Sequence, residues 1–254
     1  MKVVILSGGF GTRISEYTSI IPKPMIRIGN KPIIEHIMEI YSKHGYEDFY
    51  LALGYKAEII KEYFYKYEFL NSDFKVDLRN GKLTSYKKNF RNWEVNLIDT
   101  GIKTMTGGRL KRLQKHIGNE TFLLTYGDAV TDLNIQNVVD YHKKHGKLDT
   151  VTGVRPPARF GELKINESTN QVVDFKEKPN ITQGWINGGF FVMDPDFLNY
   201  INDDSSILEK DPLEKAPLNN ELMAYLYSGF WHCIDTKRDK DNLEEIFRKN
   251  KNKW

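Results

Sequence analysis

Cysteine is almost absent from this sequence, because Cys233 is the only one among 254 residues. A single cysteine excludes a disulfide framework and a zinc site built from several cysteines, and it fits a reducing compartment. Long apolar runs are missing too: Val3–Leu6 ends in glycines, and no stretch approaches the roughly 18 apolar residues of a membrane span. We therefore expect a cytoplasmic protein with no membrane partner.

An excess of charge of one sign is also lacking. The chain has 37 Lys and Arg against 34 Asp and Glu, a formal net charge of +3. Its basic run, at 248–253, follows a helical pattern and is interpreted as a solvated chain end. The near balance of charge, with no identifiable basic face, argues against a nucleic-acid partner.

The pattern along the first half predicts an α/β fold, because short apolar runs alternate with amphipathic segments. We expect strands at 3–6, 49–53 and 122–126, and helices at 32–43 and 57–67. Such alternation is typical of a mixed, mostly parallel, Rossmann-like nucleotide-binding sheet flanked by helices.

Two regions interrupt this alternation. Short strands around an Asn80-Gly81 turn predict an antiparallel β insertion at approximately 70–100, and strands dominate again at approximately 150–195. Because we find no Pro- or Ser-rich linker, repeat or low-complexity tract, we expect residues 1–254 to form a single domain.

The glycines after the first strand indicate a phosphate-binding loop. Gly8, Gly9 and Gly11 would expose backbone N–H groups at the carboxyl end of the sheet, where open α/β sheets bind ligands. Arg13 can donate two hydrogen bonds to a phosphate, and Lys23, between two prolines, supplies a point charge. The Walker spacing and a true G-x-G-x-x-G are both absent, so the loop alone is weak evidence.

Further motifs follow in a fixed order along nearly the whole chain. Together they resemble the signatures of the sugar-1-phosphate nucleotidylyltransferases, and most closely those of the branch that makes CDP-glucose from CTP and α-D-glucose 1-phosphate. The segments are LSGGFGTR (6–13), PKPM (22–25), DTG (99–101), MTGGRLKR (105–112), TYGD (125–128), FKEKP (175–179), INGGFF (186–191) and GFW (229–231).

This resemblance implies an Mg²⁺-dependent cytidylyltransferase. An oxygen of the sugar phosphate would attack the α-phosphorus of CTP in line, and pyrophosphate would leave, in a pathway toward deoxysugars of a surface polysaccharide. Two anions must meet, so charge neutralisation and positioning dominate and no covalent nucleophile is needed. The resemblance also implies a homo-oligomer, a hexamer built partly through the insertion.

The resemblance assigns roles residue by residue. Asp128 and Asp235 are the implied Mg²⁺ ligands, and such a small set of hard oxygen ligands suits Mg²⁺ when phosphates and waters complete its octahedron. Arg13, Lys23 and Lys178 are the implied catalytic residues. The implied nucleotide-binding residues are Gly8, Gly9, Gly11, Thr12, Arg13, Lys23, Arg109 and Asp128, and the implied sugar-phosphate-binding residues are Glu177, Lys178 and Asn187.

Several alternatives stay open from the residues alone. Asp235 could cap a helix that begins near Lys237. The chain also departs from the usual cytidylyltransferase pattern at Ile21, at His232-Cys233 and at Arg155, which leaves room for another phosphorylated acceptor. Another pyrimidine nucleotide would use the same chemistry, and a catalytically silent nucleotide-sugar-binding regulatory protein would share the fold.

Overall fold

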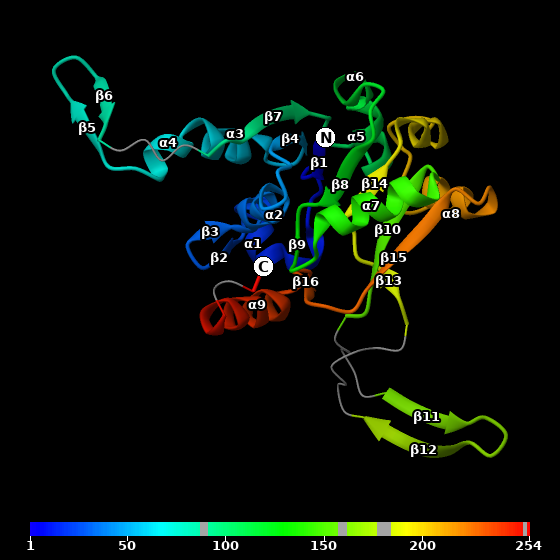
Figure 1. Cartoon of the computed structure of the whole chain (residues 1–254). Helices are drawn as coiled ribbons and strands as arrows, with labels where there is room; N and C mark the ends of the chain where they lie inside the picture. The colour runs from blue at the N-terminus through cyan, green and yellow to red at the C-terminus, as the bar shows by residue number, and fades with distance from the viewer. Residues whose placement is uncertain (87–90, 157–161, 177–183, 251–252) are drawn as a thin grey trace.

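The central sheet has a parallel half that contains the first strand of the chain. The computed structural model describes residues 1–86, 91–156, 162–176, 184–250 and 253–254. Strands β1 (Val3–Leu6), β4 (Asp48–Leu53), β7 (Glu94–Asp99) and β8 (Phe122–Tyr126) pair side by side in the order β7-β4-β1-β8. All three of these pairings are parallel. Their carboxyl ends therefore share one edge of the sheet (Figure 1).

The other half of the sheet is mixed. Strand β14 (Phe191–Met193) is antiparallel to β8, and β10 (Asp149–Val154) is antiparallel to β14 and β13 (Ile186–Asn187). Strand β15 (Leu222–Tyr227) then pairs with β10 in parallel. The mixed, mostly parallel sheet is thus confirmed. Strands β13 and β14 are separate because Gly189 and Phe190 between them both have positive φ, at 74° and 51°.

Helices cover both faces of the sheet. Their bounds are α1 (Ser15–Thr18), α2 (Ile33–Ser42), α3 (Ala57–Tyr65), α4 (Tyr67–Leu70), α5 (Thr106–Arg112), α6 (Gln114–Ile117), α7 (Ile135–His145), α8 (Asp211–Leu218) and α9 (Lys237–Lys249), with 3-10 turns at Thr12–Ile14, Lys23–Met25 and Pro195–Tyr200. The sequence sets several of these ends. The side chain of Asn134 accepts a hydrogen bond from the N–H of Asn137 to cap α7, and Gly146 ends that helix in the left-handed conformation.

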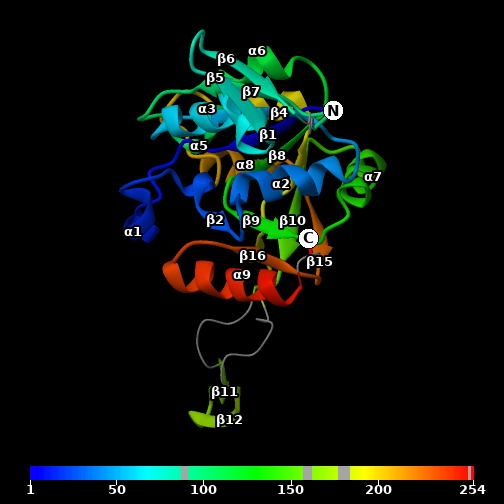
Figure 2. The same cartoon turned by 90° about the vertical axis from the view of Figure 1, so that its left-hand side faces the viewer.

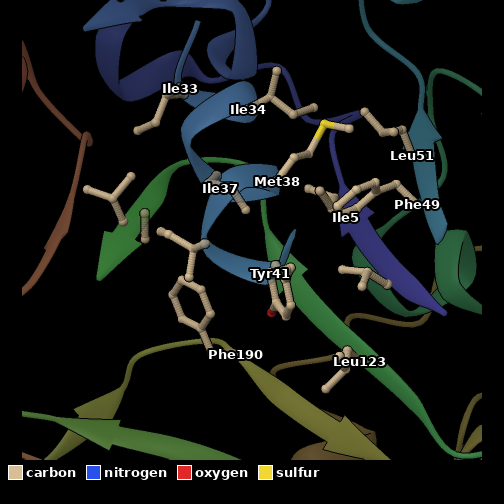
Figure 3. Close-up of a cluster of buried hydrophobic side chains, with 14 of the residues drawn as sticks. Ile5, Ile33, Ile34, Ile37, Met38, Tyr41, Phe49, Leu51, Leu123 and Phe190 are labelled. Atoms are coloured by element: carbon tan, nitrogen blue, oxygen red, sulfur yellow. The ribbon is translucent and has the colours of Figure 1, made fainter. Parts of the chain in front are cut away.

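The alternation of side chains along β1 divides the core into two layers. Val3 and Ile5 pack on the side of α2, whereas Val4 and Leu6 pack on the side of α5 and α8. In Figure 2, α2 lies on the near side of the sheet, and α5 and α8 lie on the far side. Figure 3 shows the first layer, where the apolar face of α2 lies over β1 and β4. Ile5 is fully buried, and removing such a side chain from water contributes about 1.5–3 kcal/mol. A first strand buried on both faces anchors the loop that follows it.

Short hairpins surround the sheet. They are β2–β3 (Arg27–Ile28 with Lys31–Pro32), β5–β6 (Phe74–Asp77 with Lys82–Ser85) and β11–β12 (Glu162–Asn166 with Gln171–Lys176), all antiparallel. Strands β9 (Ala129–Thr131) and β16 (Trp231–Cys233), which lie far apart in the sequence, form a further short antiparallel pair. The hairpin β5–β6 projects far from the body of the molecule (Figure 1).

The expected insertion at approximately 70–100 is too long. Within the described part of this region, only β5 and β6 form an antiparallel hairpin, whereas β7 at Glu94–Asp99 joins the main sheet in parallel with β4. Packing explains the difference, because Val95 and Leu97 lie against the core layer of α2. Among the described residues, none of the helices has the length and apolar character needed to span a membrane.

Candidate active site

A pocket of about 920 Å³ opens at the carboxyl edge of the parallel strands. Its walls include the loop after β1, the segment after β7 that leads into α5, the end of β8 and the β13 turn, together with the segments around Lys23, Glu209 and Asp235. Open α/β sheets bind ligands at this edge, beyond the carboxyl ends of their strands. The pocket is therefore the candidate active site.

The glycine loop forms one wall of the pocket. Gly8, Gly9 and Gly11 all line it, and Gly11 has a φ of 64°, a left-handed conformation that glycine adopts without strain. The hydroxyl of Thr18 donates to the carbonyl of Gly11 at 3.0 Å and fixes the turn. Thr12 begins the 3-10 turn that follows, outside the pocket wall, and Arg13 in that turn faces the pocket.

Four charged side chains meet at the floor of the pocket. The Nζ of Lys23 lies 2.5 Å from a carboxylate oxygen of Asp128 and 2.8 Å from one of Asp235. Arg13 donates to the other oxygen of Asp235 at 2.6 Å. Burial opposes the charge on Lys23, but the two carboxylates outweigh it and raise its pKa above the ordinary value. Residues more than 200 positions apart thus form one charged cluster.

Arg109 lines the pocket next to the glycine loop. Its side chain is buried, and its guanidinium donates to the carbonyls of Gly8, Leu53 and Gly101 at 2.9, 3.0 and 2.7 Å. It also donates to the hydroxyl of Thr100 at 2.8 Å. Arg109 therefore links the loops that follow β1, β4 and β7.

Asn187 stands on the opposite wall of the pocket, at the end of β13. Its Nδ2 donates to the phenol oxygen of Tyr126 at 3.2 Å, and its Oδ1 accepts from the N–H of Gly189 at 2.8 Å. The indole N–H of Trp231 donates to the carbonyl of Gly188 at 2.8 Å. These contacts fix the amide of Asn187 facing the pocket.

Glu209, which sequence reasoning did not single out, completes this wall. Glu209 lines the pocket, and one of its carboxylate oxygens accepts from the hydroxyl of Thr106 at 2.7 Å. Thr106 belongs to a recognised motif, but Glu209 sits in an ordinary polar run with no local signal. Only the fold brings it to the site.

The comparisons with known proteins decide the family. The family model described as "Nucleotidyl transferase" matches residues 2–231. This chain belongs to the nucleotidyl transferase family. A glucose-1-phosphate cytidylyltransferase of Salmonella typhimurium is 47% identical to it over 255 aligned residues, which cover 100% of this chain and 98% of that protein.

Two further relatives agree with this assignment. A protein of Bacillus subtilis described as a probable glucose-1-phosphate cytidylyltransferase is 39% identical, and the alignment covers 100% of this chain and 99% of that one. The crystal structure of HddC from Yersinia pseudotuberculosis complexed with GMP-PN matches with a TM-score of 0.70 and 25% identity, covering 97% of this chain and 99% of that chain. This chain is therefore similar to these three proteins over essentially its whole length.

The carboxylates of the nucleotidyl transferase fit a Mg²⁺ ion. Asp128 and Asp235 already direct an oxygen each at one cation, the ammonium of Lys23. No group of three or more His, Cys, Asp and Glu side chains suited to a metal ion is present in the part of the chain that the structure describes. Substrate phosphates and waters would have to complete the octahedron, which is the usual arrangement for Mg²⁺.

The other predicted site residues have the following places. Asp235 does not cap α9, because Thr236 is its N-cap and forms a capping box with Asp239. Glu177 and Lys178 lie outside the described residues. The remaining predicted residues, except Thr12, line the pocket, and their individual roles are taken up as proposals below.

Proposed function

We propose that this nucleotidyl transferase is a glucose-1-phosphate cytidylyltransferase, which condenses CTP with α-D-glucose 1-phosphate to CDP-glucose and pyrophosphate. The observation that carries the proposal is the 47% identity to such an enzyme over the full chain. Since the site draws on residues from Arg13 to Asp235, we infer that the chain acts as a single nucleotidyltransferase domain. CDP-glucose would then enter the synthesis of deoxysugars for a surface polysaccharide.

The charged cluster supports the chemistry. Arg13 and Lys23 supply positive charge for the triphosphate, and the glycine loop offers backbone N–H groups beside them. Bringing two phosphate groups together requires this neutralisation, so positioning and electrostatics lower the barrier for in-line attack on the α-phosphorus. A bound Mg²⁺, held by Asp128 and Asp235, would supply further charge to the phosphates.

The sugar phosphate would bind on the β13 side of the pocket. Asn187, fixed by Tyr126 and Gly189, can exchange hydrogen bonds with sugar hydroxyls. Glu177 and Lys178 keep the roles that the resemblance implies, as acceptor for sugar hydroxyls and as cation for the sugar phosphate. Arg109 would act on the nucleotide through the glycine loop, because its guanidinium already binds the carbonyl of Gly8.

Pyrophosphate release with a matrix of substrates tests the function. CTP, UTP, dTTP, ATP and GTP are each paired with several sugar 1-phosphates, with and without Mg²⁺. We expect strong activity for CTP with glucose 1-phosphate and none without the metal. Activity with CTP and a different acceptor would change the substrate only, and activity with UTP or dTTP would reassign the base. Nucleotide binding with no pyrophosphate from any pair would favour the silent regulatory protein.

We also propose a homo-oligomer, a hexamer built partly through hairpin β5–β6. An isolated two-stranded hairpin is at best marginally stable in water, yet this one exposes apolar side chains on the projecting arm. Leu78 is 90% exposed, and Val76 and Leu83 are 44% and 46% exposed. Light scattering after size exclusion should give an oligomer mass, and a clean monomer would contradict the proposal.

A further inference from the structure

One wall of the pocket holds a carboxylate with a fixed orientation. Glu209 follows Leu208, which is fully buried and whose N–H donates to the hydroxyl of Thr106 at 2.9 Å. The same hydroxyl donates to Glu209 at 2.7 Å. Backbone and side chain are thus both tied to the first residue of α5, so Glu209 presents its carboxylate to the pocket in one arrangement.

A phenol lies beside this carboxylate. Tyr126, at the end of β8, is deeply set in the wall, and its burial and the neighbouring Glu209 raise its pKa, so the phenol stays neutral. It also accepts from Asn187 at 3.2 Å. The four side chains of Thr106, Glu209, Tyr126 and Asn187 therefore make one continuous polar strip across the pocket, which we call the Glu209 strip.

The charges of the pocket differ between the strip and the floor. Arg13 and Lys23 lie at the floor with the two aspartates, where phosphates are expected. Glu209, by contrast, forms no ion pair within the described residues, and a carboxylate repels phosphate. An anionic acceptor at this position favours a neutral group that donates hydrogen bonds. The neutral donors of the two substrates are mostly their sugar hydroxyls, and the remaining one is the amino group of cytosine.

We propose that Glu209 is a specificity-determining residue that accepts hydrogen bonds from sugar hydroxyls of the substrates. The bound hydroxyl belongs either to the ribose of CTP or to the hexose of the sugar phosphate. This inference rests on the proposed function. A hydrogen bond to a charged acceptor that is lost in a buried site lowers kcat/KM by about 10- to 100-fold.

The test compares complete and deoxygenated substrates. The nucleotide arm uses CTP, 2′-deoxy-CTP and 3′-deoxy-CTP, and the sugar arm uses glucose 1-phosphate and its monodeoxy analogues. We expect the wild-type enzyme to prefer one complete substrate by about 10- to 100-fold over the analogue that lacks the bound hydroxyl. In Glu209→Ala that preference should fall to within about 3-fold. Glu209→Gln keeps an acceptor oxygen and should retain part of the preference.

The matched control is Glu214→Gln, an exposed residue in α8 outside the pocket, which should leave every ratio unchanged. An equal loss for all substrates in Glu209→Ala would overturn the proposal, because Glu209 would then support Thr106 and Tyr126 or bind the amino group of cytosine, which every substrate pair in the test contains.

Binding measurements separate this proposal from the proposed function. The affinity of CTP, its two deoxy analogues and glucose 1-phosphate is measured by calorimetry for the wild type and Glu209→Ala. If the wild type binds these molecules without releasing pyrophosphate, the function is wrong, and the affinity ratios alone decide the role of Glu209. If the wild type binds none of them, both proposals are wrong.

Discussion

Gly8 and Arg109 are close enough to be tested as a pair. A Cβ added at Gly8 would lie 2.3 Å from Nη1 and 2.5 Å from Cζ of Arg109, far inside contact distance. Gly8 does not have a positive φ, so its backbone tolerates alanine. The cost of Gly8→Ala therefore comes from displacing the buried guanidinium.

The contacts of Arg109 determine how much stability Gly8→Ala should cost. Displacement removes four hydrogen bonds of 3.0 Å or less from the guanidinium. The carbonyl of Gly8 keeps the N–H of Tyr55 at 3.0 Å, and that of Leu53 keeps the N–H of Thr100 at 2.9 Å, so the main acceptor that loses its partner is the carbonyl of Gly101. Because a buried unsatisfied acceptor costs about 1–3 kcal/mol, we expect Gly8→Ala to lower the free energy of unfolding by about 2–3 kcal/mol.

Urea denaturation of a double-mutant cycle measures this coupling. In an Arg109→Ala background the obstacle is gone, and Gly8→Ala should cost less than about 0.5 kcal/mol, which gives a coupling energy of about 2 kcal/mol. Gly9→Ala is the matched control, because a Cβ there meets nothing within 4 Å and its cost should be equal in both backgrounds. Additive effects of Gly8→Ala and Arg109→Ala would refute the placement of the guanidinium.

Two further predictions concern buried charge. Burial raises the pKa of Asp149 well above its ordinary value, with the N–H of Thr150 opposing, so the folded state keeps a proton that the unfolded chain loses above about pH 4. The free energy of unfolding of the wild type therefore falls by up to about 1.4 kcal/mol per pH unit until the pH reaches the pKa of folded Asp149. Urea denaturation between pH 5 and 8 should show that Asp149→Asn becomes more stable relative to the wild type as the pH rises. A stability difference between the two proteins that does not change with pH would contradict this prediction. Lys23→Met leaves Asp128 and Asp235 without the ammonium that lies between them. We expect kcat for pyrophosphate release to fall by about 10²–10³-fold. A loss of less than 10-fold would show that Lys23 is not a catalytic residue.

The spacing of apolar residues, together with the glycines and prolines at the ends of elements, predicted the first half of the fold well. The apolar run of β1 and the helical period of α2 are local signals, and both elements lie within a residue or two of the expected bounds. The insertion was predicted wrongly because β7 is an edge strand with half-buried side chains. Its residues carry no sign of whether the partner strand runs parallel or antiparallel, which only the packing on β4 decides.

The site residues likewise fall into those that the sequence predicted and those that only the fold reveals. The motifs predicted Lys23, Asp128 and Asp235 as one group, and the structure brings them together. Sequence reasoning could not find Glu209, because its partner Thr106 is 103 positions away. Sequence reasoning placed Arg109 near the nucleotide. It could not show that the guanidinium donates hydrogen bonds to backbone carbonyls, because such contacts depend on where three separate strands end.

The Mg²⁺ dependence of CDP-glucose formation tests the central claim most directly. The wild type, Asp128→Asn and Asp235→Asn are assayed with CTP and glucose 1-phosphate across a Mg²⁺ titration, with Asp140→Asn, an exposed carboxylate on α7, as control. We predict Mg²⁺-dependent turnover in the wild type and control, and losses of about 10²–10³-fold in the other two variants. Turnover that is independent of Mg²⁺, or unchanged in Asp128→Asn and Asp235→Asn, would contradict the account.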